Sequence, residues 1–250
     1  MAKRKKMLVS TRAPEKLSKK KTKNATKLLL EKIAALQKIF YASGQRSLLI
    51  VVQGIDASGK DGLISKLSTG MNPMGCTVHS FKAPTREELG HDFLWRVHAV
   101  TPAKGMIQIF NRSHYEDVLV TRVESIIDTK TAKKRFAHIN HFEQLLMENG
   151  TTILKFYLHV SKERQAERLN ERAADPKKNW KQNDDDWKTN QKYEAYQEVY
   201  EDVLQHCNQP KWTIVPSDQN WYKEYIVIKQ VYAALKGMKL SYPLKQSTEK

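Results

Sequence analysis

The stretch SLLIVVQGIDASGKDG, residues 47–62, decides the fold. Its first part, the wholly apolar run over 47–52, is typical of a strand that is buried on both faces. Directly after it, Gly54, Gly59 and Lys60 have the spacing G-x-x-x-x-G-K of a phosphate-binding loop, where backbone N–H groups and a lysine hold an anion. The N-terminus of a following helix adds partial positive charge. The sequence therefore predicts a strand, a phosphate-binding loop and a helix in succession.

Two acidic residues depart from the usual pattern of such a loop. The residue after the lysine is normally Ser or Thr, whose hydroxyl binds Mg²⁺, but this chain has Asp61. Asp56 lies inside the loop, where a bare carboxylate would repel phosphates unless Mg²⁺ lay between them, and oxygen ligands suit Mg²⁺. We therefore expect Asp56 to be a metal ligand and Asp61 to be a first-turn residue favoured by the helix dipole.

Apolar runs alternate with helical stripes along the rest of the chain. We predict strands at 47–52, 76–82, 106–110, 151–160 and 212–216, and helices at 25–42, 60–69, 86–100, 115–126, 131–149, 161–173, 188–206 and 221–237. Buried strands that alternate with helices favour a parallel sheet covered by helices on both faces. Ligands of such sheets bind at the carboxyl ends of the strands, where the loop 53–62, Lys82, Asn111 and Arg112 fall.

The stretch MIQIFNRSHYEDVL, residues 106–119, is the second anchor of the predicted site. An apolar strand at this place often ends in an acid that holds Mg²⁺, but this chain has Asn111. Arg112 follows at once, where phosphates would lie. Glu116 and Asp117 come shortly after, and either of them could restore the missing charge. A solvated polar turn is the alternative interpretation of this stretch.

Arg164, Arg168 and Arg172 recur every four residues on one predicted helix. Such a row is compatible with a solvated face paired with nearby glutamates. Because the polar stretch 174–187 follows, the row is equally compatible with a lid whose arginines close over phosphates. The residues alone leave these two interpretations open.

The charge of the chain is strongly basic and unevenly distributed. The net charge is +16, and residues 1–25 contribute ten Lys or Arg against one Glu. We predict a flexible basic tail over 1–24, which either attracts a polyanion or keeps the protein in solution. The two cysteines, Cys76 and Cys207, form no CxxC motif and indicate a reducing cytoplasm. No run is long enough to span a bilayer, and no apolar segment of a secretory signal follows the basic start.

Several stretches together resemble the polyphosphate kinase 2 family over roughly residues 25–245: GIDASGKDG, SFKAPT, HDFLWRVH, FNRSHYEDVLV and LKFYLHVSKERQAERLNER. GKDG in place of GK[ST] is itself a trait of that family. The resemblance implies an α/β protein with a three-layer α/β/α P-loop kinase fold, here with a five-stranded parallel sheet. It also implies one domain over 25–245, a helical lid at about 161–190 and a short tail at 246–250.

The resemblance further implies Mg²⁺-dependent phosphoryl transfer between inorganic polyphosphate and nucleoside mono-, di- and triphosphates. Asn111 replaces the aspartate of many relatives, a departure of the subgroup linked to using both AMP and ADP, and we expect both acceptors. We also expect a cytoplasmic homo-oligomer, a dimer or tetramer, without membrane or nucleic-acid partners. The rival functions are an ATP-dependent nucleotide or nucleoside kinase of related fold and a basic nucleic-acid-binding module.

The expected site residues fall into four groups, which partly overlap. The catalytic residues are Asp56, Lys60, Arg112 and Asp117; the metal ligands are Asp56 and Asp117; the phosphate-binding residues are Gly54, Ala57, Ser58, Gly59, Lys60, Asp61, Lys82, Arg112 and Arg122; and the nucleotide-binding and lid residues are Asn111, Glu116, Arg168 and Arg172. Donor and acceptor are both polyanions, so cationic positioning is the main task. The acceptor phosphate is already largely ionised, and no strong general base is needed.

Overall fold

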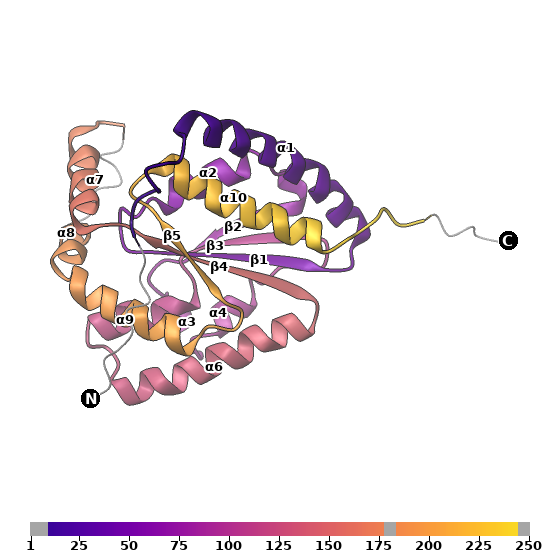
Figure 1. Cartoon of the computed structure of the whole chain (residues 1–250). Helices are drawn as coiled ribbons and strands as arrows, with labels where there is room; N and C mark the ends of the chain where they lie inside the picture. Colours follow the sequence, from indigo (N-terminus) through magenta and orange to yellow (C-terminus); the bar gives the residue numbers. More distant parts are fainter. Residues whose placement is uncertain (1–9, 178–183, 245–250) are drawn as a thin grey trace.

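A parallel sheet forms the centre of the molecule (Figure 1). The computed structural model describes residues 10–177 and 184–244 of the chain. Its strands are β1 (Ser47–Gln53), β2 (Cys76–Ser80), β3 (Ile107–Asn111), β4 (Thr151–His159) and β5 (Trp212–Pro216), in the order β2-β3-β1-β4-β5. Every neighbouring pair is parallel, and all of β1 is buried between β3 and β4. The predicted five-stranded parallel sheet is thereby confirmed.

Helices cover both faces of the sheet. They are α1 (Lys19–Ser43), α2 (Lys60–Ser68), α3 (Arg86–Leu89), α4 (Trp95–His98), α5 (Val120–Val123), α6 (Thr129–Glu148), α7 (Lys162–Ala174), α8 (Asp184–Gln191), α9 (Tyr193–His206) and α10 (Asn220–Gly237), with 3₁₀ turns η1 (Pro73–Gly75) and η2 (His114–Val118). Among the described residues, no helix is long and apolar enough to cross a bilayer.

The two sides of β1 explain the three-layer α/β/α arrangement. Leu48 and Ile50 point to one face and pack in the core with α1, α2 and α10. Leu49 and Val51 point to the opposite face and pack with α6, η2 and α9. Because successive side chains of a strand alternate between the faces, a fully apolar strand is satisfied only between two helical layers. Figure 1 shows these layers above and below the sheet.

Three predicted helices are interrupted in the structure. The stretch 86–100 forms α3 and α4, because the capping box of Thr85 and Glu88 starts a short helix that closes at Gly90. The stretch 115–126 is the 3₁₀ turn η2 followed by α5. The stretch 188–206 is divided between α8 and α9 at Lys192, whose ψ of 17° is not helical. Helical periodicity alone does not reveal such local breaks.

The amino-terminal segment is more ordered than the prediction of a tail over 1–24. The first helix begins at Lys19, not at 25, because the side chain of Ser18 accepts the Lys21 N–H as a cap. Upstream, the hydroxyl of Thr11 donates to Asp218 at 2.8 Å, and the N–H of Ala13 donates to Gln219 at 2.7 Å. Residues 10–24 are therefore attached to the body of the protein. Residues 1–9 and the predicted tail 246–250 lie outside the described residues.

Candidate active site

The loop between β1 and α2 has the close backbone turns of a phosphate-binding loop. A Cβ at Gly54 would lie 2.6 Å from the Ser58 hydroxyl and 3.0 Å from the Leu158 carbonyl, so only glycine fits there. Ala57 and Gly59 have φ values of 57° and 92° and turn the chain into the helix. Successive turns of this kind expose N–H groups on one side, and the following helix adds its dipole.

Lys60, the lysine of this loop, is buried over the loop itself. Its ammonium donates to the carbonyls of Gly54 at 2.6 Å and Ile55 at 3.1 Å. Burial, with a further contribution from nearby Arg112, lowers the pKa of Lys60 to about 8. A bound polyanion would favour the charged form, because an opposite charge close by raises the pKa of an ammonium group.

Arg112 lies between two carboxylates at the mouth of the loop. Its guanidinium donates to Asp56 and, at 3.1 Å, to Glu116. Burial opposes its charge, but these two carboxylates more than compensate and raise the pKa of Arg112. Its φ of 62° is left-handed, which is uncommon for a bulky residue and frequent at functional sites. The predicted residues Asp56, Arg112 and Glu116 therefore meet beside the phosphate loop.

Asp117 points elsewhere, although it adjoins Glu116 in the sequence. Its carboxylate lies 3.5 Å from Arg96 and 3.8 Å from Arg135. Burial raises the pKa of Asp117, against the effect of the two arginines. In this structure Glu116, not Asp117, faces Arg112 together with Asp56. The contacts of Asp117 suit the anchoring of η2 against α4 and α6 better than the predicted role in binding a metal.

Asn111 and Asp61 meet where β3 ends and α2 begins. The Asn111 side chain donates from Nδ2 to Asp61 at 3.0 Å and to Ser80 at 3.4 Å. Within the described part of the chain, the buried Oδ1 of Asn111 has no hydrogen-bond partner. Asp61 lies in the first turn of α2, as predicted, and in addition its carboxylate contacts Asn111 at the end of the neighbouring strand. These oxygens lie where the loop's Ser or Thr and a strand-end acid usually bind Mg²⁺.

The oxygen donors fit a magnesium ion that is completed by substrate. Across residues 10–177 and 184–244, no three His, Cys, Asp or Glu side chains form a metal-binding group by themselves. Mg²⁺ does not need one, because it usually takes one or two carboxylates, several waters and substrate phosphates. Asp61, Asn111 Oδ1 and Asp56 supply oxygens of the required type. The unpartnered Oδ1 of Asn111 is the observation that carries this fit.

Arg168 of α7 contacts the loop from behind. Its guanidinium donates to the carbonyls of Ala57 at 3.0 Å, Ser58 at 2.9 Å and Ser217 at 2.7 Å. Arg164, in contrast, pairs with Glu167 and Glu171 on its own helix. Arg164 therefore behaves as part of a solvated face paired with glutamates, whereas Arg168 is directed at the phosphate loop. Figure 1 shows α7 and α8 together at one end of the sheet. The lid was expected at about residues 161–190, which include α7 and most of α8.

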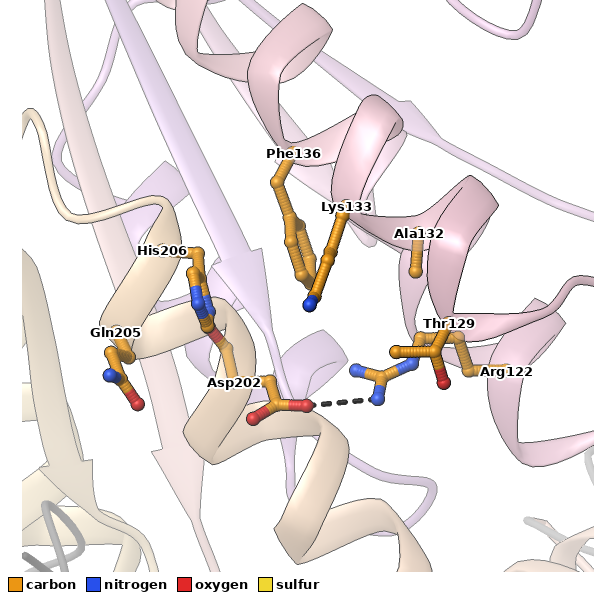
Figure 2. A pocket seen from close by; sticks show the side chains of 8 residues that line it. All are labelled: Arg122, Thr129, Ala132, Lys133, Phe136, Asp202, Gln205 and His206. Atoms are coloured by element: carbon orange, nitrogen blue, oxygen red, sulfur yellow. Dashed lines mark hydrogen bonds and ion pairs between the residues drawn. The ribbon is translucent and has the colours of Figure 1, made fainter. Parts of the chain in front are cut away.

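Arg122 lines a separate cavity of about 320 Å³ between α6 and α9. Figure 2 shows its guanidinium directed towards Asp202, with a distance of 2.9 Å between Nη2 and Oδ2. Lys133, Phe136 and His206 border the same cavity. This arrangement does not bring Arg122 into contact with the phosphate loop. Lys82 is exposed directly after β2, and Arg172 lies on α7 one helical turn beyond Arg168.

Several residues of the site carry no recognisable signal in the sequence. The hydroxyl of Thr189 donates to Asp56 at 3.2 Å, and Tyr196 and Tyr200 border the same small cavity of about 10 Å³ beside Arg112. That space holds about one water molecule. Lys223 of α10 contacts the loop at Gly59. These residues are distant in sequence, and only the tertiary fold brings them together.

A parallel sheet of this topology, a glycine loop that leads into a helix, and a group of cations around that loop define a phosphotransferase of the P-loop kinase class. The model of the family described as polyphosphate kinase 2 matches residues 16–243. The chain belongs to this family. It is a phosphotransferase that moves phosphoryl groups between polyphosphate and nucleotides.

Individual relatives agree with the family assignment. An AMP/ADP-polyphosphate phosphotransferase of Meiothermus ruber is 43% identical over 221 residues, which cover 88% of this chain and 83% of the relative. An ADP-polyphosphate phosphotransferase of Rhodopseudomonas palustris is 39% identical over 86% of this chain and 79% of the relative. The crystal structure of polyphosphate kinase 2 from Arthrobacter aurescens has a TM-score of 0.92 at 35% identity, over 95% of this chain and 87% of that one. These findings do not favour either rival function.

Proposed function

We propose that this enzyme phosphorylates both AMP and ADP with polyphosphate as the donor. The observation that carries the proposal is the contact of Asn111 with Asp61, which places an amide at the end of β3 beside a carboxylate. A second carboxylate would add negative charge beside the transferring group, whereas an amide can hydrogen-bond phosphate oxygens without repelling them. A site with less negative charge tolerates the terminal phosphate of the acceptor at more than one depth in the site, and this phosphate lies farther from the nucleoside in ADP than in AMP. The Meiothermus ruber relative, which is named for both acceptors, supports the proposal.

The residues of the site divide the work between the two polyanions. Loop N–H groups and Lys60 hold donor phosphates, and the left-handed turn at Arg112 aims its guanidinium at the phosphoryl group. In the structure Arg112 is occupied by Asp56 and Glu116. We infer that substrate takes over at least one of these contacts, so the two carboxylates hold the arginine in place until then. The acceptor phosphate oxygen attacks the terminal phosphorus of polyphosphate in line. The bond from this phosphorus to the rest of the chain breaks, the polyphosphate shortened by one unit leaves, and the cations stabilise the charge.

We propose Mg²⁺ as the divalent metal, held by Asp61, Asn111 and Asp56 together with substrate phosphates. When bound, it would neutralise charge that develops on the phosphoryl group during transfer. We further propose that α7 and α8 form the lid, with Arg168 as its fixed base. The cytoplasmic location and the homo-oligomer of two or four chains stay predictions.

A matrix of donors and acceptors tests the proposed function. Purified protein is incubated with polyphosphate or ATP as the sole donor and with AMP, ADP or a nucleoside as the acceptor, and products are separated by ion-exchange chromatography. We expect ADP from AMP and ATP from ADP with polyphosphate alone. Transfer that requires ATP would favour the rival kinase, and use of only one acceptor would contradict the proposed range. The Lys60→Met variant controls for contaminating kinases.

A further inference from the structure

Helix α10 places a buried lysine against the back of the phosphate loop. Lys223 is 1% exposed, and its ammonium donates to the carbonyl of Gly59 at 3.0 Å and to the side-chain oxygen of Asn220 at 3.0 Å. Neither Lys223 nor Asn220 belongs to the motifs that mark the site in the sequence. A lysine is almost never buried to this degree unless its ammonium group is hydrogen-bonded or ion-paired, because the charge loses its hydration.

Lys223 completes a row of donors that cover successive loop carbonyls. Arg168 donates to the carbonyls of Ala57 and Ser58, and the Ser217 hydroxyl also donates to the Ser58 carbonyl at 2.6 Å. Lys223 covers the next carbonyl, that of Gly59. With the carbonyls fixed on the outer side, the loop cannot turn a carbonyl oxygen towards the bound phosphates. Such preorganised N–H groups stabilise an anion without a cost of reorganisation during the reaction.

The φ of 92° at residue 59 is left-handed and favours glycine, and the close approach of Lys223 adds to this constraint. A Cβ at Gly59 would lie 2.2 Å from the Lys223 ammonium and 3.4 Å from the Arg168 guanidinium. The two cations are themselves tied together, since Asn220 Oδ1 accepts from Arg168 at 3.2 Å and from Lys223 at 3.0 Å. The middle of α7, the start of α10 and the loop therefore form one hydrogen-bonded unit.

The charges around Lys223 favour an anionic ligand. Arg168 and Arg164 on α7 and Lys60 on α2 are positive, and Glu224 is the acid that acts against them. Burial, followed by the charge of Arg168, lowers the pKa of Lys223 to about 7. A polyanion in the loop would reverse this effect, because it supplies the missing negative charge.

We propose that Lys223 is a positioning residue of the phosphate site. It donates to the carbonyl of Gly59, which also accepts the Leu63 N–H of α2 at 3.2 Å, while Arg168 and Ser217 hold the carbonyls of Ala57 and Ser58. The three donors together keep the loop N–H groups directed at the polyphosphate. A consequence is that binding of the polyanion is accompanied by uptake of a proton at Lys223. This uptake separates positioning by charge from a purely structural role, which would leave the proton count unchanged.

Calorimetry with tripolyphosphate as the probe tests the proposal. Titrations at pH 7.5 in buffers of different ionisation enthalpy give the number of protons taken up on binding. Lys223→Met keeps the length and burial of the side chain, and Lys229→Met, an exposed lysine of the same helix, is the matched control. We expect Lys223→Met to take up about half a proton less than wild type and to bind about 10-fold more weakly. The control should match wild type in both.

A second variant covers the case in which Lys223→Met does not fold. Asn220→Ala removes the oxygen shared by Lys223 and Arg168 from an exposed position. It should raise the KM for polyphosphate with little change in the thermal midpoint of unfolding. Unchanged proton uptake and unchanged tripolyphosphate affinity in folded Lys223→Met, or an unchanged KM in Asn220→Ala, would overturn the proposal. Neither outcome would bear on whether polyphosphate is the donor, since wild type is assayed for that separately.

Discussion

The amide nitrogen of Asn111 lies 3.0 Å from the carboxylate of Asp61, so the end of β3 and the first turn of α2 share a hydrogen bond. Asn111→Asp would place two carboxylates in contact, and like charges at this distance cannot both ionise without a cation between them. We therefore expect half-maximal activity of the variant at a different Mg²⁺ concentration from wild type. We also expect the ratio of kcat/KM for AMP to kcat/KM for ADP to change. Magnesium titrations with each acceptor measure both effects.

A suitable control for this variant is Asn208→Asp. The side-chain oxygen of Asn208 accepts the Trp212 N–H at 3.1 Å, a contact that a carboxylate can also make. The control should behave as wild type. If Asn111→Asp keeps both the acceptor ratio and the Mg²⁺ dependence, residue 111 does not determine the acceptor range, and Glu116 becomes the next candidate.

Asp56 is expected to be essential for turnover and dispensable for folding. Asp56→Asn keeps the size of the side chain but removes the charge that faces Arg112 and that suits Mg²⁺. We expect kcat to fall by about 100-fold or more with an unchanged thermal midpoint, because losing even a residue that supports a metal ligand costs about 10–100-fold. The exposed Glu87→Gln serves as the control for an acid-to-amide change. Near-normal turnover of Asp56→Asn at limiting Mg²⁺ would contradict the assignment.

The lowered pKa of Lys60 predicts that activity falls with rising pH while the contribution of Lys60 to stability increases. The pKa of Lys60 is lowered to about 8 in the folded protein from its ordinary value of 10.5, so the folded protein loses this proton first as pH rises. The free enzyme loses the cation above about pH 8, and kcat/KM for polyphosphate should decline there. Between these two values the unfolded chain binds more protons, so the contribution of Lys60 to stability rises with pH.

Rate profiles between pH 6 and pH 10 test this expectation. The descending limb should persist in Lys223→Met, because it belongs to Lys60, and it should move to higher pH in kcat, since bound polyanion favours the charged lysine. A kcat/KM that stays level from pH 7 to pH 10 would show that Lys60 keeps its proton in the free enzyme.

The sheet and the phosphate loop were predictable because their signals are local. A run of apolar residues before Gly54 specifies a central strand, and the position of Lys60 follows from the loop spacing alone. The partner of Arg112 was not predictable between two adjacent acids. In the 3₁₀ turn η2, successive side chains point in directions about a third of a turn apart, so only the turn geometry selects Glu116.

The supporting cations were harder to recognise for a different reason. Lys223 is one of three lysines on the predicted helix 221–237, and Arg168 belongs to a row that also fits a solvated face. Their partners are backbone carbonyls more than a hundred residues away in the chain. Backbone carbonyls carry no side-chain identity, and the sequence pattern therefore contains no trace of these contacts.

The basic amino terminus is expected to help capture long polyphosphate. Residues 1–9 contain Lys3, Arg4, Lys5 and Lys6, whereas residues 10–24 are attached to the body through Thr11 and Ala13. Deleting 1–9 should raise the KM for long chains at low salt and leave kcat unchanged, because salt screens the attraction between charges to within about 10 Å at 0.1 M. A variant in which Lys3, Arg4, Lys5 and Lys6 are all replaced by Gln keeps the length of the chain and removes only the charge. An unchanged KM at low ionic strength would contradict this role.

A buried charged network behind η2 is expected to determine stability. Lys155 and Glu143 both have fully buried side chains, 2.6 Å apart, and Glu143 also contacts His114 and the Tyr115 hydroxyl. Lys155→Met would leave the Glu143 charge without its cation, which typically costs about 3–5 kcal/mol of the free energy of unfolding. The double variant Lys155→Met with Glu143→Gln should recover part of this loss, because no buried charge is left. Urea unfolding of the wild type, both single variants and the double variant gives the coupling energy. Additive effects of the two substitutions would mean that Lys155 and Glu143 do not stabilise the protein as a pair.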